Sequence, residues 1–276
     1  MPVVTVTDSA ARLPASLAQT YRIHVVPLHI LLDGRDLLDG VDELPADLYQ
    51  RAAGTAGAAP WELAQAYQAA VAESAGAGVV AVHLSAELSS TVGSARHAAR
   101  ACDGRVAVVD SRSAAMGTGF VALAAARAAA AGADLNESVA QACSAIERVH
   151  AFLVVQRLDN LRRSGRIGAT ASWLGTALAI KPLLRLDAGR LVLGQRVRTT
   201  SRATAAMVEQ VLDVVGERRA ELAVQHVDNP AAAAEVAATL ESALPACGPA
   251  IVTDLGPVLG VHLGPGAVGV VVCVGD

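Results

Sequence analysis

The sequence predicts an α/β fold in two domains: an N-terminal three-layer αβα domain with a mainly parallel sheet, and a C-terminal α/β domain with a mixed sheet. Three observations support this prediction. The chain has 276 residues, which is enough for about two domains. Up to residue 149, short valine-rich runs alternate with alanine-rich stretches of helical length, the pattern of βαβ units on a parallel sheet. Beyond residue 150, Asp187-Ala188-Gly189 between two apolar runs indicates a hairpin. We therefore expect domains at 1–149 and 150–276.

In the N-terminal domain, buried strands are expected where apolar residues run without interruption. These runs are 3–6, 23–32, 78–83 and 106–109. Helices are expected at 14–19, 44–53, 61–74, 91–101, 115–131 and 136–149. Asp33-Gly34 is a turn signal, and the segments 36–42 and 54–60 are expected to be irregular.

The C-terminal domain is expected to mix a hairpin with crossover helices. Its expected strands are 152–155, 183–186, 191–197, 222–227 and 268–274. Its expected helices are 158–163, 171–179 and 231–244, the last with Pro230 in its first turn. A long amphipathic helix is also expected to begin within 198–202 and to end near residue 219.

Composition excludes several functional classes. The formal net charge is −4 and no basic tract is present, which argues against binding to nucleic acid or to an anionic membrane surface. The four cysteines are scattered, without CxxC or zinc spacing, and indicate buried thiols of a reducing compartment and no metal site. The N-terminus lacks a charged leader, and no apolar run is long enough to span a bilayer. We expect a soluble cytoplasmic protein.

Polar side chains follow three of the predicted parallel strands. The segments are Thr7-Asp8-Ser9, Ser85 through Ser90, and Asp110-Ser111. Because ligands of an open parallel sheet bind beyond the carboxyl ends of its strands, these side chains are expected to converge there. The alternative is that they are only helix caps and turn residues, which loops of this kind usually carry.

The second of these loops leads into a helix through Ser89, Ser90 and Thr91. Their hydroxyl oxygens are suited to capping the backbone N–H groups of a first helical turn. The same N–H groups and the helix dipole also attract an anion. The sequence is compatible with a capped helix and with an anion site.

Four further residues are candidates with structural alternatives. Arg166 follows Gly165 in a tight turn and is suited to binding a carboxylate or phosphate; its alternatives are a solvated charge or an interdomain ion pair. His262 precedes a glycine loop that would let backbone approach a ligand, but it could equally be structural. Arg198 and Arg202 lie at a helix start, where the dipole disfavours cations, which hints at contact with an anion or a partner protein.

Common catalytic motifs have no support. Gly264 through Gly269 matches G-x-G-x-x-G, but a valine-rich strand follows it where a dinucleotide site needs a helix. The sequence contains no phosphate-binding Walker loop, no HExxH and no G-x-S-x-G.

Seven stretches in this order resemble the DegV family of bacterial fatty-acid-binding proteins, over essentially the whole chain. They are Thr7-Asp8-Ser9 with Leu13-Pro14, Leu88 through Thr91, Val109-Asp110-Ser111 through Met116-Gly117, Leu161 through Ile167, Lys181 through Leu184, Arg198 through Ala203, and His262 through Gly266.

The resemblance implies a protein that holds a long-chain fatty acid between its two domains. Some members are the lipid-binding subunit of a fatty acid kinase, in which a separate subunit carries ATP and Mg and converts the bound carboxylate to an acyl phosphate. On this basis the carboxylate meets Ser89 and Thr55, with Ser90 and Thr91 beside Ser89 and with Arg166 and His262 in the surrounding network. Arg202 matches an arginine implicated in phosphoryl transfer with the kinase. The chain alone would not be an enzyme, would need no cofactor of its own, and could contact a membrane surface transiently.

The chain departs from the family pattern at the head-group loop. Thr55 through Ala59 stands where the family usually has Thr-Ser-Gln-Pro-Ser, so the loop has lost its second hydroxyl and its amide. Two hypotheses from other classes are carried forward. One is an autonomous serine hydrolase or acyl transferase that uses Ser89 with His83 or His262. The other is a phosphotransferase for a small hydroxylated substrate.

Overall fold

The computed structural model describes residues 2–167 and 181–275, and the chain divides into two compact units after Glu147. The expected helix at 171–179 lies outside the described residues. Each unit has its own sheet, and the mixed α/β class agrees with the prediction.

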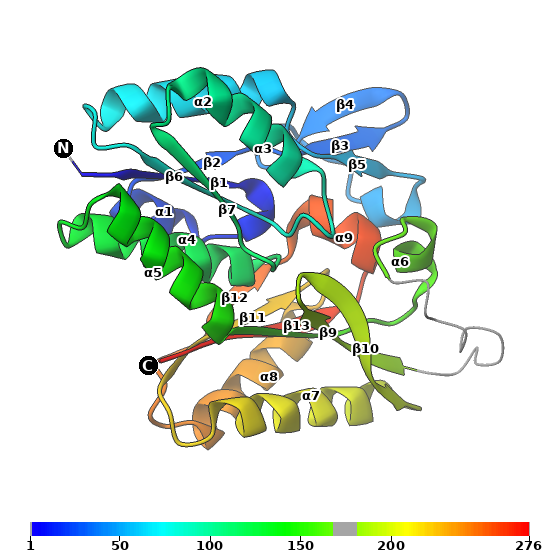
Figure 1. The fold of residues 1–276 in the computed structure, drawn as a ribbon. Coiled ribbons are helices and arrows are strands. Elements are labelled where there is room, and N and C mark those ends of the chain that lie inside the picture. The colour runs from blue at the N-terminus through cyan, green and yellow to red at the C-terminus, as the bar shows by residue number, and fades with distance from the viewer. Residues whose placement is uncertain (1, 168–180, 276) are drawn as a thin grey trace. The chain divides into compact units, whose positions relative to one another are not determined.

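The first unit is built on a parallel sheet in the order β2-β1-β6-β7. Its strands are β1 (Val4–Asp8), β2 (Ile23–Val26), β6 (Val79–His83) and β7 (Val106–Asp110). Its helices are α1 (Ala15–Thr20), α2 (Pro60–Glu73), α3 (Thr91–Ala99), α4 (Met116–Ala130) and α5 (Leu135–Arg148). Figure 1 shows α2 and α3 on one face of this sheet and α1, α4 and α5 on the other. Strands buried on both faces explain the continuous apolar runs, and β6 is buried at every position.

The run 23–32 does not form the single strand that we expected. It is divided at Pro27 and Leu28 into β2 and β3 (His29–Leu32), and the two strands belong to different sheets. Pro27 has no N–H with which to continue the hydrogen bonding between strands. The N–H of Leu28 donates to Ser9 Oγ at 3.1 Å and not to a neighbouring strand.

A second, three-stranded sheet corrects two more expectations. β3 pairs antiparallel with β4 (Arg35–Leu38) and β5 (Gly54–Ala56), although both segments were expected to be irregular. The expected turn between β3 and β4 is present, with φ of 51° at Asp33 and 75° at Gly34. Positive φ at both central residues is the turn geometry that matches strand twist in a hairpin.

The expected helix at 44–53 is also wrong, since only a short 3-10 turn forms at Leu48–Gln50. Arg51 has extended backbone angles, and its side chain donates to Asp47 and Asp33. After Arg51 the chain continues into β5, which pairs with β3, and no helix forms there.

The second unit is built on a mixed sheet in the order β10-β9-β8-β13-β11-β12. Its strands are β8 (Val149–Val154), β9 (Lys181–Asp187), β10 (Arg190–Val197), β11 (Ala220–His226), β12 (Ile251–Asp254) and β13 (Val268–Val274). Its helices are α6 (Asp159–Arg163), α7 (Thr200–Val215), α8 (Pro230–Ala243) and α9 (Gly256–Leu263). The expected β9–β10 hairpin is present, and β11–β12 is the parallel pair of this sheet.

Helices α7 and α8 cover one face of this mixed sheet (Figure 1). Met207, Val211 and Val215 follow one another at helical spacing along α7 and are fully buried against the strands. Helix α9 was not predicted. It is inserted between β12 and β13 and packs against α6.

Candidate functional site

The three polar loops at the carboxyl edge of the parallel sheet meet, as the sequence predicted. The N–H of Leu84 donates to Asp8 Oδ2 at 3.0 Å, and the N–H of Ser111 donates to the carbonyl of His83 at 3.0 Å. The N–H of Ser85 donates to the carbonyl of Ser113 at 2.8 Å. These hydrogen bonds, one of them to the Asp8 side chain and two between backbone groups, hold the three loops together.

Beneath the loops lies a buried chain of hydrogen bonds from Tyr67 through His83 to Asp8. The Tyr67 hydroxyl lies 2.7 Å from His83 Nε2, and His83 Nδ1 lies 2.9 Å from Asp8 Oδ2. The side chains of His83 and Asp8 are fully buried. Because both ring nitrogens of His83 have partners, this histidine is not available as a general base for Ser89. The geometry removes the His83 form of the hydrolase hypothesis.

Ser89 and Thr91 form a hydroxyl pair at the start of α3. Their oxygens lie 2.8 Å apart, and the N–H of Thr91 donates to Ser89 Oγ at 3.2 Å. Ser90 occupies the N-cap position, but its side chain makes no capping hydrogen bond, so the expected cap is supplied by Ser89 instead. One hydroxyl hydrogen is used within the pair, and the other is left outside it. Thr91 is fully buried, whereas Ser89 is partly exposed beside the positive end of the helix.

The segment that carries Thr55 is packed against this hydroxyl pair. Thr55 lies on β5 opposite Ile30, and Gly57 follows it two residues later. A Cβ atom added to Gly57 would lie 2.6 Å from Thr91 Oγ1 and 3.4 Å from Ser89 Oγ. Gly57 therefore lets the backbone approach the Thr91 hydroxyl more closely than a side chain would allow, whereas the distance to Ser89 Oγ is an ordinary contact. The structure thus brings the Thr55 loop and the Ser89 loop together within the first unit.

In the second unit, Arg166 and His262 lie near each other. Arg166 follows α6, where its N–H donates to the carbonyl of Leu161 at 3.1 Å and its guanidinium donates to the carbonyl of Ser164. His262 lies in the last turn of α9, which contacts α6. Burial and the charge of Arg166 lower the pKa of His262 to about 4, so the imidazole is neutral at pH 7.

Arg202 is exposed in the first turn of α7. Its backbone N–H donates to the side chain of Thr199, which caps the helix. The guanidinium is therefore held at a helix start with its charge facing solvent, in the position that the sequence indicated.

Gln156 is a polar residue that sequence reasoning missed. Its side-chain oxygen accepts from Lys181 Nζ at 3.0 Å, and its side-chain amide donates to the carbonyl of Gly266 at 3.2 Å. Gly266 lies in the glycine loop after α9, so Gln156 joins this loop to β9. No local pattern identifies it, because its partners are 25 and 110 residues away.

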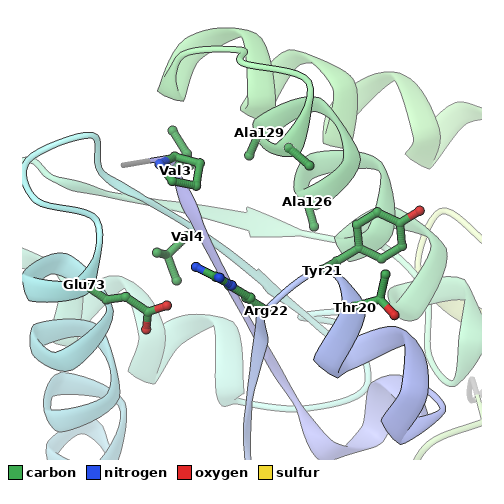
Figure 2. A pocket seen from close by; sticks show the side chains of 10 residues that line it. Val3, Val4, Thr20, Tyr21, Arg22, Glu73, Ala126 and Ala129 are labelled. Carbon is green, nitrogen blue, oxygen red and sulfur yellow. The ribbon is translucent and has the colours of Figure 1, made fainter.

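A separate crevice of about 150 Å³ opens in the first unit at the start of β1. Figure 2 shows Val4 and Arg22 between Glu73 of α2 and Tyr21, with Ala126 and Ala129 of α4 nearby. The Ser89 loop follows the end of β6, which runs parallel to β1. The crevice therefore lies at the opposite edge of the sheet from the hydroxyl pair.

Within residues 2–167 and 181–275, no three His, Cys, Asp or Glu side chains are grouped closely enough to hold a metal ion. Over the same ranges, no helix combines the length and the apolar character needed to cross a bilayer.

Comparison with known proteins places these features in one family. The family model described as "Uncharacterised protein, DegV family" matches residues 2–274. A DegV domain-containing protein of Mycobacterium tuberculosis is 60% identical over 275 residues, covering 100% of this chain and 98% of that protein.

Two solved structures are similar over their whole length. One, described by its fatty acid binding, is a DegV family protein from Thermus thermophilus with a TM-score of 0.89 and 30% identity, covering 99% of this chain and 100% of that one. The other is DegV from Bacillus subtilis, described as a fatty acid binding protein, with a TM-score of 0.90, 26% identity and 100% coverage of both chains. The chain therefore belongs to the DegV family.

Proposed function

We propose that this protein binds a long-chain fatty acid and presents it to a separate ATP-dependent kinase subunit, which converts the carboxylate to an acyl phosphate. The carboxylate is bound by Ser89, Thr91 and Thr55, with Ser90 at the same helix start. Arg166 and His262 contribute to the hydrogen-bond network around the head group. The protein acts in the cytoplasm and is not an enzyme by itself, since ATP and Mg belong to the partner.

The observation that carries the proposal is the contact of Gly57 with the Ser89–Thr91 hydroxyl pair. It supports a site in which the Thr55 loop and an outward O–H donor face one small anion at a helix N-terminus. The two similar structures described by fatty acid binding support a carboxylate as that anion.

The division of energy between tail and head group is consistent with this role. Burying an acyl chain stabilises the complex by about 0.8 kcal/mol per methylene before ordering costs. A carboxylate at a helix N-terminus adds only about 0.3–1 kcal/mol, or up to roughly 2 kcal/mol when partly buried. The tail therefore supplies affinity, and the hydroxyl pair orients the head group.

Lipid analysis tests the proposal. Protein purified from a bacterial host is denatured, and its extracted lipids are quantified by mass spectrometry. We expect close to one fatty acid per chain in the wild type and in the control Ser94→Ala, which changes a serine farther along α3. We expect Ser89→Ala to lose most of its bound lipid. A wild-type protein that is empty in repeated preparations contradicts the proposal, and labelling of Ser89 by a fluorophosphonate would instead favour a hydrolase.

Arg202→Ala tests the role of the partner. Because the Arg202 side chain is exposed on α7, we expect this variant to bind fatty acid as the wild type does. With the kinase subunit and ATP present, acyl-phosphate formation should fall. Loss of lipid binding would assign Arg202 to the ligand site, and ATP turnover by the chain without a partner would favour a phosphotransferase.

A further inference from the structure

His29 connects the three-stranded sheet to the first turn of α2. Its Nδ1 lies 2.8 Å from Asp36 Oδ1 on β4, and its Nε2 lies 2.9 Å from Glu62 Oε2 on α2. The side chains of His29 and Glu62 are 12% and 17% exposed, so this contact is largely shielded from water. Asp36 is 59% exposed and lies at the outer end of the arrangement.

These contacts favour one protonation state of the ring. Both ring nitrogens face carboxylate oxygens, which only accept hydrogen bonds, so the geometry favours the imidazolium, the form in which both nitrogens carry hydrogen. Burial lowers the pKa of His29, but hydrogen bonds and charge from Glu62 and Asp36 outweigh it, and the net pKa is raised. β5 (Gly54–Ala56), the other strand beside His29, carries no titratable side chain.

Glu62 extends the connection to the loop that carries Thr55. The same Oε2 atom that faces His29 accepts from the N–H of Ala59 at 2.7 Å. The loop is thus fixed at Ala59 by Glu62 and at Thr55 by the pairing of β5 with β3. Gly57 lies between these two anchors, against the Ser89–Thr91 hydroxyl pair.

We propose that protonated His29 is a positioning residue for the head-group site, which it acts on through Glu62 by holding the Thr55–Ala59 loop against Ser89 and Thr91. This inference rests on the proposed fatty acid function and adds a pH dependence to it. When the ring loses its proton, one of its nitrogens becomes a hydrogen-bond acceptor that faces a carboxylate. The positive charge that holds the Glu62 carboxylate in place is then lost. The loop then loosens.

The direction of the effect follows from the raised pKa. A histidine stabilised in its charged form contributes fully below its ordinary pKa of 6.5, and its contribution is lost as the pH rises through the higher folded value. Affinity for fatty acid should therefore fall as the pH rises above 6.5 and through the raised pKa of His29. The loss should be roughly fivefold, the difference between a charge-assisted and a neutral hydrogen bond.

The test measures binding of a pyrene-labelled long-chain fatty acid by fluorescence between pH 6 and pH 8.5 at constant ionic strength. His29→Gln and Glu62→Gln should each flatten the profile, because neither retains the charged contact. His24→Gln is the matched control, since His24 pairs with Glu73 at 2.7 Å at the far end of the same helix. It should keep the wild-type profile, including any contribution from titration of the ligand itself.

Hydrogen exchange supplies a second readout in the unliganded protein. After correction for the intrinsic pH dependence of exchange, amides of residues 54–59 should lose protection as the pH rises in the wild type and in His24→Gln, but not in His29→Gln. Wild-type protein that binds the probe with the same profile as His29→Gln overturns the role of His29 and leaves the proposed function intact. Absence of probe binding at every pH contradicts the proposed function itself.

Discussion

Replacing Gly57 by alanine is the most direct perturbation of the contact between the two loops. The added Cβ would lie 2.6 Å from Thr91 Oγ1, and ordinary van der Waals contact begins near 3.4 Å. The loop or the hydroxyl must therefore move by about 0.8 Å. Thr91 Oγ1 lies 2.8 Å from Ser89 Oγ, so a movement of this size disrupts the hydroxyl pair.

The expected magnitude has two parts. Loss of a hydrogen bond between neutral groups lowers the free energy of unfolding by about 1 kcal/mol. A hydrogen bond to a charged carboxylate is worth about 1.5–3 kcal/mol, so a displaced donor should weaken fatty acid binding by roughly tenfold to a hundredfold.

Gly93→Ala is the matched control. Gly93 lies two residues after Thr91 in α3, is exposed, and has nothing within 4 Å of an added Cβ. Alanine there should raise the free energy of unfolding by about 0.5–1 kcal/mol and leave binding unchanged. Urea unfolding and displacement of a fluorescent fatty acid measure the two quantities. Equal affinity of Gly57→Ala and the wild type would refute the assignment of the carboxylate to these two loops.

Three predictions concern stability. Tyr67→Phe leaves the buried His83 Nε2 without its partner and should lower the free energy of unfolding by about 1–3 kcal/mol in urea; an unchanged value would mean that the hydrogen bond contributes little. The pKa of His262 is about 4 in the folded protein and 6.5 in the unfolded chain, so between these pH values the unfolded chain binds more protons. The free energy of unfolding should therefore fall by up to about 3 kcal/mol as the pH drops from 6.5 to about 4. His262→Gln should flatten that dependence, and a slope that persists would assign it to other groups. Ala115 has φ 53° and ψ −144°, a conformation suited to glycine, so Ala115→Gly should raise the thermal midpoint by relieving about 1 kcal/mol of strain, whereas a lower midpoint would contradict it.

The structure also shows which parts of the candidate site could be predicted from the sequence and which could not. Ser89 and Thr91 were identifiable because helix capping is a local property, readable from residue type and the helix that follows. No local pattern distinguishes Gly57 from the other small residues of its loop. Its contact with Thr91 depends on the pairing of β5 with β3. Glu62 caps α2 without the serine or threonine that usually marks a capping box, since Ala59 stands at that position.

The sequence by itself determined the α/β class, the alternation of strands and helices along the first unit, and the hairpin of the second unit, because periodicity and turn chemistry act over a few residues. Only the tertiary structure decided that the run 23–32 contributes to two sheets, that 44–53 is not a helix, and that His29 faces Glu62. Each of these outcomes depends on partners far away in the chain, whose hydrogen bonds outweigh local preference.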